Sequence, residues 1–308
     1  MKTDTLTIAD KAKQDVDSSF VLEPTPADAT NLSERPMRYY SARTGWQLVD
    51  LAELWRHREL IWMLALRDIK VKYRQTVVGI VWAIIQPLMT MLVFGVLFHL
   101  IRGRPTTGDV PFAVTSLCGL VPWQLFAGTL TQSTSSLVVN QNLITKVYFP
   151  RVALPLSTLA VGMVDFALAF VILLLTIFIY GVVPTVAVVA LPLMIVLVLL
   201  TSMAFGLWLS ALNALYRDVQ YAIPFFVQMG FFVSPVVYEM NAVIPSQWQW
   251  VYSLNPMVGV LEGFRWALLG MESPPIASML LSTVGVGIML FGGLLYFRLM
   301  ERQFADRI

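Results

Sequence analysis

The sequence predicts an all-α integral membrane protein with six transmembrane helices. Hydrophobic residues make up 57% of the 308 residues and charged residues only 13%, and the mean hydropathy is +0.71. Soluble domains carry about twice that share of charged residues. The apolar residues gather in long runs, and Lys and Arg gather at the ends of these runs. Most of the chain is therefore expected to lie in lipid.

Six apolar runs approach or exceed the roughly 20 residues that cross a hydrocarbon core of about 30 Å. Pro122 and Gln124 interrupt the second run, while Pro224 and Gln228 interrupt the fifth. We expect these two to form broken or kinked helices that face protein rather than lipid. The six runs are residues 77–101, 111–130, 154–180, 185–215, 222–238 and 276–299.

The positions of Lys and Arg predict that both termini are cytosolic, because positive residues favour the cytosolic side of a membrane. With this orientation only Arg102, Arg104 and Arg265 fall outside. The Lys and Arg that fall inside, next to the spans, are Arg56, Arg58, Arg67, Lys70, Lys72, Arg74, Lys146, Arg151, Arg217, Arg298, Arg302 and Arg307.

The part before the first span divides into two segments. Residues 1–45 mix Asp, Lys, Ser, Thr and Pro without the apolar core of a signal peptide, which predicts a disordered cytosolic tail. Residues 46–74 carry Trp55, Trp62 and Ile69 near helical spacing against Arg58 and Arg67, which predicts an amphipathic helix in the cytosolic interface. This helix is either a membrane anchor alone or also the rim of a docking surface. Residues 75–308 form the transmembrane domain.

A short helix is expected between the last two spans. Asn255 and Pro256 form an N-cap followed by proline at the first helical position, and Gly270 ends the segment. Glu262 and Arg265 stand three apart, on one face of this helix. The spacing predicts a re-entrant or interfacial helix on the outer side. The aromatic residues expected near its headgroups are Trp248, Trp250, Tyr252 and Trp266.

The motifs of nucleotide hydrolysis and metal catalysis are missing from the sequence. It contains no GxxxxGK[ST] loop, no HExxH and no GxSxG, and its two histidines, His57 and His99, are far apart. Its one cysteine, Cys118, lies in an apolar run and is expected to be buried. We therefore expect no cofactor in this chain. A membrane-embedded glycan-processing enzyme stays an alternative with little support.

Asp165 is the one acidic residue deep inside an apolar run. A lone carboxylate in lipid costs a few kcal/mol unless it is paired or hydrated. We expect a structural polar contact with a neighbouring helix or a partner protomer. The alternative is a proton-coupled carrier.

A set of short motifs is spread over about residues 46–300. They are the stretch 66–79 (LRDIKVKYRQTVVG), Trp82 with Gln86-Pro87-Leu88, 119–123 (GLVPW), 142–151 (NLITKVYFPR), 214–219 (ALYRDV), 234–236 (SPV), 255–257 (NPM) and 262–265 (EGFR). In these motifs and in their order the sequence resembles the transmembrane subunits of ABC-2-type polysaccharide exporters.

The resemblance implies the ABC-2 (type V exporter) fold: a homodimer of six-helix subunits in the bacterial inner membrane. Each subunit rests on a separate cytosolic ATPase, which binds ATP and Mg. The expected substrate is lipid-linked polysaccharide such as O-antigen, and no nucleic acid is expected as a partner. Alternatives are capsule or teichoic acid, or a small drug-like or lipid substrate.

Three groups of candidate site residues follow. The resemblance assigns the segment between spans two and three to a coupling helix that docks on the ATPase. Asn140 or Asn142 is expected to cap this helix and Pro150 to end it. The coupling residues are Asn142, Leu143, Ile144, Lys146, Val147, Tyr148, Phe149 and Arg151.

Aromatic rings that sugars could stack on predict a channel lined by Trp82, Trp123, Phe126 and Tyr238. An outer gate is expected at Glu262 and Arg265.

Overall fold

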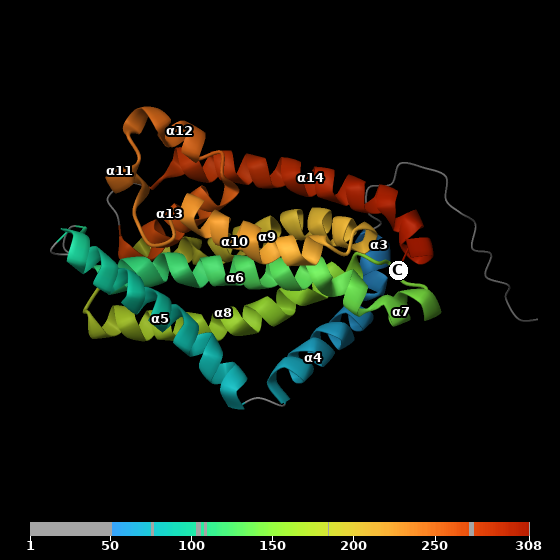
Figure 1. Cartoon of the computed structure of the whole chain (residues 1–308). Coiled ribbons are helices and arrows are strands. Elements are labelled where there is room, and N and C mark those ends of the chain that lie inside the picture. The colour runs from blue at the N-terminus through green and yellow to red at the C-terminus, as the bar shows by residue number, and fades with distance from the viewer. Residues whose placement is uncertain are drawn as a thin grey trace, which may run out of the picture. The chain divides into compact units, whose positions relative to one another are not determined.

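Helices make up nearly all of the described chain (Figure 1). The structure, a computed structural model, describes residues 51–74, 77–102, 106–107, 110–183, 185–270 and 274–307. The tail predicted for residues 1–45 lies outside this part. The long helices are α4 (Arg58–Arg74), α5 (Val77–Arg102), α6 (Phe112–Val139), α8 (Ala153–Ile179), α9 (Leu191–Leu215), α10 (Val219–Val233), α13 (Pro256–Leu269) and α14 (Ile276–Arg307).

Short elements connect these helices. Two two-residue strands pair antiparallel between α5 and α6, with Thr106 opposite Pro111 and Thr107 opposite Val110. The remaining short elements are α3 (Leu51–Arg56), α7 (Gln141–Lys146), η1 (Val186–Ala190), α11 (Met240–Val243), η2 (Ser246–Trp248), α12 (Gln249–Tyr252), β1 (Thr106–Thr107) and β2 (Val110–Pro111).

Four helical segments of the described chain are long and apolar enough to cross a membrane: Phe112–Val139, Ala153–Ile179, Val186–Leu215 and Ile276–Glu301. They confirm the second, third, fourth and sixth predicted spans. The second is eight residues longer than its predicted 20, since it continues to Val139. Its polar end is compatible with a helix because hydroxyls bond within it, as when Thr134 Oγ1 donates to the carbonyl of Leu130.

The first and fifth predicted spans are helices, but their apolar stretches are shorter: Ile84–Leu97 within α5, and Val219–Val233, which is α10. α10 ends five residues before the predicted boundary at 238. Its end has a local cause, because Pro235 disfavours helical geometry at the preceding Ser234, which is extended here. The count of six spans therefore stays a prediction.

Helix α6 is the central helix of the bundle. In the most apolar 18-residue stretch of α6, 78% of the residues are buried. The corresponding share is 28% in Ala153–Ile179 and 22% in Ile276–Glu301. It packs along α8 and α9, and α5, α10 and α13 also contact it. In Figure 1 these helices lie around it, with α5 crossing obliquely. α6 thus belongs to the protein interior. α8 and α14 instead expose large apolar side chains, among them Phe178, Ile288 and Leu299.

The α7 end of the bundle has its own apolar core. Leu64 of α4, Ile144 of α7, Leu207 of α9 and Phe297 of α14 are buried together there. The amphipathic helix predicted for residues 46–74 corresponds to α3 and α4, and its position in the membrane interface stays a prediction. α4 buries Leu64 and Ala65 against this core and leaves Trp62 60% exposed. It is therefore packed onto the bundle on one face and open on the other.

Helix α13 is the short helix that the sequence predicts between the last two spans. The Asn255 side chain accepts a hydrogen bond from the Met257 N–H, Pro256 follows, and Gly270 has the left-handed φ of +68° that favours glycine. Most of α13 is buried against α6, α9 and α14. Of the aromatic residues predicted beside it, Trp248 and Trp250 are exposed.

Arg265 fixes α13 in place. Its guanidinium is completely buried and lies 3.0 Å from Oε1 of Glu262. It also donates to the carbonyl of Val236, at 2.7 Å, and to that of Thr115 of α6, at 3.5 Å. Glu262 accepts in addition from the Met240 N–H. One buried cation therefore connects α6, α13 and the segment after α10.

The close approach around Arg265 requires glycine at position 119 of α6. A Cβ there would lie 1.9 Å from the carbonyl oxygen of Val236 and 2.9 Å from Nη2 of Arg265.

We predict that Gly119→Ala lowers the free energy of unfolding by about 2–3 kcal/mol, because the backbone must shift. SDS titration in mixed micelles measures this. Gly128→Ala, on the same helix with nothing within 4 Å of the new Cβ, should stay within about 1 kcal/mol of the unchanged protein. Equal effects of the two substitutions would contradict the packing described.

Candidate functional site

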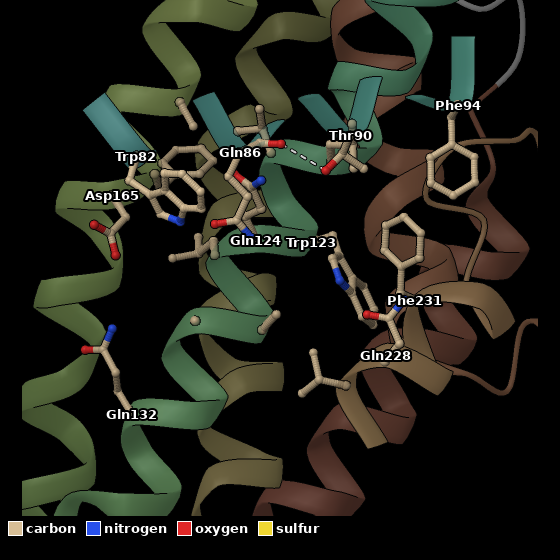
Figure 2. Close-up of a pocket in the computed structure, with 18 of the residues that line it drawn as sticks. Trp82, Gln86, Thr90, Phe94, Trp123, Gln124, Gln132, Asp165, Gln228 and Phe231 are labelled. Atoms are coloured by element: carbon tan, nitrogen blue, oxygen red, sulfur yellow. Dashed lines mark hydrogen bonds between the residues drawn. The ribbon is translucent and has the colours of Figure 1, made fainter. Parts of the chain in front are cut away.

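A groove of ≈ 440 Å³ lies between α5, α6, α8 and α10, with the end of α4 at its edge (Figure 2). It opens to the surface, because Trp82 and Phe232 on its wall are 60% and 55% exposed. Its wall combines aromatic rings, glutamine amides and one ion pair. The polar and aromatic lining residues are Lys72, Trp82, Gln86, Thr90, Phe94, Trp123, Gln124, Gln132, Asp165, Phe166, Gln228, Phe231 and Phe232.

Packed rings build one side of the groove. The ring of Phe231 lies 5.9 Å from that of Trp123, edge to face, and 5.7 Å from that of Phe94. In Figure 2 these three side chains come from three different helices. A Cβ at Gly230 would lie 3.1 Å from the Trp123 ring, so glycine lets α10 approach that ring closely. Trp123 is 5% exposed and held in place, whereas Trp82 has a free face.

Four glutamines, Gln86, Gln124, Gln132 and Gln228, line the same groove. Each amide offers two donor hydrogens and a carbonyl acceptor. Among the residues that the structure describes, no hydrogen bond joins these side-chain amides to other protein groups, although Thr90 does bond the main-chain carbonyl of Gln86. The groove therefore presents donors and acceptors that a polar ligand can use.

Asp165 lies on the groove wall and is paired. Lys72 Nζ of α4 is 2.5 Å from its Oδ2, and the Tyr73 hydroxyl donates to its Oδ1. Burial, and then the hydrogen bond to Asp165, raise the pKa of Tyr73, so this hydroxyl stays a donor. The expected structural contact with a neighbouring helix is confirmed. The pairing joins α4 to the middle of α8, about 18 Å along from Ala153.

A second polar contact joins α4 to the start of α7. Arg67 Nη2 donates to Oδ1 of Asn140 at 2.7 Å, and the Asn140 amide donates to the carbonyl of Ser136. The structure corrects the capping prediction, because Asn140 occupies the N-cap position but its side chain does not cap α7. α7 also ends at Lys146, four residues before Pro150, with Val147 already extended.

The eight predicted coupling residues divide into two sets. Ile144 and Phe149 are buried in the core at the α7 end, Leu143 packs against it, and the Arg151 guanidinium donates to the carbonyl of Glu301. The exposed set is Asn142, Lys146, Val147 and Tyr148. Tyr148 is 80% exposed. The second set offers an exposed surface for a partner, and the buried side chains of the first set hold that surface against the bundle.

The four predicted channel residues also divide. Trp82 and Trp123 line the groove. Phe126 is buried behind it, with its ring 5.3 Å from Trp123 and 5.9 Å from Phe205. The Tyr238 hydroxyl lies 2.6 Å from that of Tyr252 and donates to the carbonyl of Phe232, and it does not line the groove. Glu262 and Arg265, predicted as a gate, form the buried pair described above.

The ABC-2 type transporter family model matches residues 59–269 of this chain, more than half of its length. The chain belongs to this family. The resemblance drawn from the motifs is thereby confirmed. The match extends from the start of α4 to the end of α13, so the groove, α7 and Arg265 all lie within the family domain.

Curated relatives of this ABC-2 chain are named for export or transport. It is 29% identical over 258 residues to the O-antigen export system permease protein RfbA of Myxococcus xanthus, covering 83% of this chain and 98% of the relative. An RfbA of Klebsiella pneumoniae is 26% identical, over 67% and 79% of the two chains. The polysialic acid transport protein KpsM of Escherichia coli is also 26% identical, over 74% and 90%.

Sequence reasoning did not assign the glutamines and Lys72 to a site. The signal for the glutamines was present, because Gln124 and Gln228 interrupt apolar runs where a polar side chain needs a partner or a cavity. The pairing of Lys72 with Asp165 joins residues 93 positions apart, and no local pattern indicates it.

Proposed function

We propose that this chain is the membrane-spanning subunit of an ATP-driven exporter that moves lipid-linked polysaccharide, such as O-antigen, across the bacterial inner membrane. The observation that carries the proposal is the groove, where aromatic faces lie beside amides that bond to no other group in the described part of this ABC-2 chain. Sugars present C–H faces that stack on rings and hydroxyls that bond to amides. The export names of the relatives support the same substrate class.

The alternatives fit the groove less well or share its chemistry. A drug-like or lipid substrate would favour an apolar lining, whereas four amides face this groove. A capsule polysaccharide would use the same rings and amides, whereas teichoic acid carries a phosphate on each repeat, for which the described lining offers no free cation. A second candidate is an anionic polysaccharide, because KpsM is named a polysialic acid transport protein.

In this proposal two copies of the chain form the exporter. The groove opens beside α5, whose face with Met89, Leu92, Val93 and Val96 is about half exposed. A second copy against this face would close the groove into a channel. Both termini and α7 are placed in the cytosol, following the distribution of Lys and Arg. α13, with Glu262 and Arg265, then lies at the outer side as the predicted gate.

A separate ATPase subunit, which binds ATP and Mg, supplies the work in this proposal. The exposed side chains of α7 and the residues after it offer it a contact surface. Ile144 and Phe149 connect that surface to the core at the α7 end. A push on Tyr148 would therefore reach α8 and α14 through packed side chains rather than through a free loop.

The export proposal is tested by Trp82→Ala. Trp82 is 60% exposed on the groove wall, so its removal takes away a stacking face with little loss of packing. We expect export of long chains to fall on the order of tenfold, since one base-like stacking contact contributes about 1–3 kcal/mol. Surface polysaccharide in cells that depend on this subunit measures it. The matched control is Trp250→Ala, a similarly exposed tryptophan that does not line the groove. Undiminished export in the Trp82 variant, at normal subunit abundance, would count against the proposal.

The ATPase contact is tested by Tyr148→Ala. An exposed aromatic anchor of this kind contributes on the order of 2 kcal/mol or more to association. We expect the variant to insert normally but to lose the cognate ATPase on purification and to cease export. Tyr180→Ala, an exposed tyrosine at the opposite end of α8, is the control and should retain both. Retention of the ATPase and of export by the Tyr148 variant would sink the docking assignment.

A further inference from the structure

The groove wall carries almost no charge. By sequence, α6 and α10 contain no Asp, Glu, Lys or Arg, and α5 contains only Arg102 at its last position. Among the described residues that line the groove, only Lys72 and Asp165 are ionisable side chains that carry charge at neutral pH. Their charges cancel, because the Lys72 ammonium lies 2.5 Å from the Asp165 carboxylate.

We propose that the groove selects glycan segments without net charge and discriminates against polyanionic glycans such as polymers of hexuronic or sialic acid. This inference rests on the proposed function and narrows its substrate class. One curated relative is named for an anionic glycan, since polysialic acid carries a carboxylate on every sugar, whereas the name O-antigen specifies no charge. Membership of the family alone therefore does not decide between them.

The physical basis is the cost of moving a carboxylate out of water. An unpaired charge inside a membrane costs a few kcal/mol, and pores that conduct anions compensate it with rings of Lys or Arg. Lys72 cannot compensate the charge of a substrate, because its ammonium is paired with Asp165 and lies over the ring of Tyr73. Lys70 and Arg74 are exposed on α4 and do not line the groove.

The remaining lining suits an uncharged sugar. Gln86, Gln124 and Gln228 offer both donors and acceptors, as hydroxyl groups do. The ring of Trp82, and the partly exposed ring of Phe231 that packs against the buried Trp123, accept the C–H faces of a sugar irrespective of its hydroxyl pattern. The groove thus binds a neutral repeat without requiring one exact sugar, and it offers nothing to replace the water around a row of carboxylates.

The test compares two substrates in one assay. The chain and its cognate ATPase are reconstituted in inside-out vesicles and given ATP. The probes are a lipid-diphosphate-linked oligomannose and a lipid-diphosphate-linked oligoglucuronate of equal length. Protection from a membrane-impermeant glycosidase reports transport. We expect the neutral chain to be transported on the order of tenfold faster or more, as the cost of an uncompensated charge implies.

Charge variants give the mechanism. Gln124→Lys adds a cation to the groove and should reduce the ratio of oligomannose to oligoglucuronate transport rates severalfold. Gln247→Lys is the same change at an exposed position of η2 and should leave this ratio unchanged. Asp165→Asn removes the carboxylate that balances the charge of Lys72, so the described lining gains a net positive charge, which should also narrow the ratio of the two transport rates. The double variant Asp165→Asn/Lys72→Met is neutral again and should restore the preference even though the ion pair is gone.

Three outcomes would overturn the inference. Equal transport of both probes, or faster transport of the glucuronate, overturns the inference and leaves the proposed export function standing. A double variant that stays as unselective as Asp165→Asn shows that the ion pair acts through structure rather than charge, which also overturns it. Transport of neither probe by the unchanged complex removes the proposed function, and the inference with it.

Discussion

Arg265 holds a full positive charge where no water reaches it, and the arrangement of the α13 end depends on how that charge is satisfied. Its guanidinium is paired with Glu262 at 3.0 Å and donates to the Val236 carbonyl at 2.7 Å. Removing one partner of such a buried pair costs about 3–5 kcal/mol. α13, the segment after α10 and the first turns of α6 are therefore locked together. The groove wall contributed by α6, which includes Trp123 and Gln124, rests on a helix that cannot shift without breaking this lock.

Helix α4 gives the groove a second support and connects it to the opposite end of the bundle. Arg67 bonds to Asn140 at the start of α7, and five residues further along Lys72 is paired with Asp165 on the groove wall. These two positions are separated by about 7.5 Å along the helix. A displacement of α7 by a partner would therefore act on Asn140, on α4 and on the Asp165 pair through direct contacts. This gives a physical route from the proposed ATPase surface to the substrate groove.

Local rules in the sequence predicted the helices well. Run lengths gave the four confirmed spans, and Asn255, Pro256 and Gly270 marked both ends of α13 because each residue acts through its own backbone. The sequence failed where long-range contacts decide. Tyr238 is aromatic and near the fifth run, but its hydroxyl is bonded to Tyr252 and Phe232 rather than turned to the groove. In the same way, apolar spacing could not distinguish Ile144, which is buried, from Tyr148, which is exposed.

The most direct test of the account asks whether glycan passes through this groove. A photoreactive phenylalanine analogue at Gln228, which lines the groove, is compared with one at Phe226, which is exposed on α10 but does not line it. The complex with its cognate ATPase is given lipid-diphosphate-linked oligomannose and ATP, illuminated, and assayed for glycan attached to the chain. The account predicts ATP-dependent attachment at position 228 and little at 226. Equal labelling at both positions, or export without labelling at 228, would contradict it.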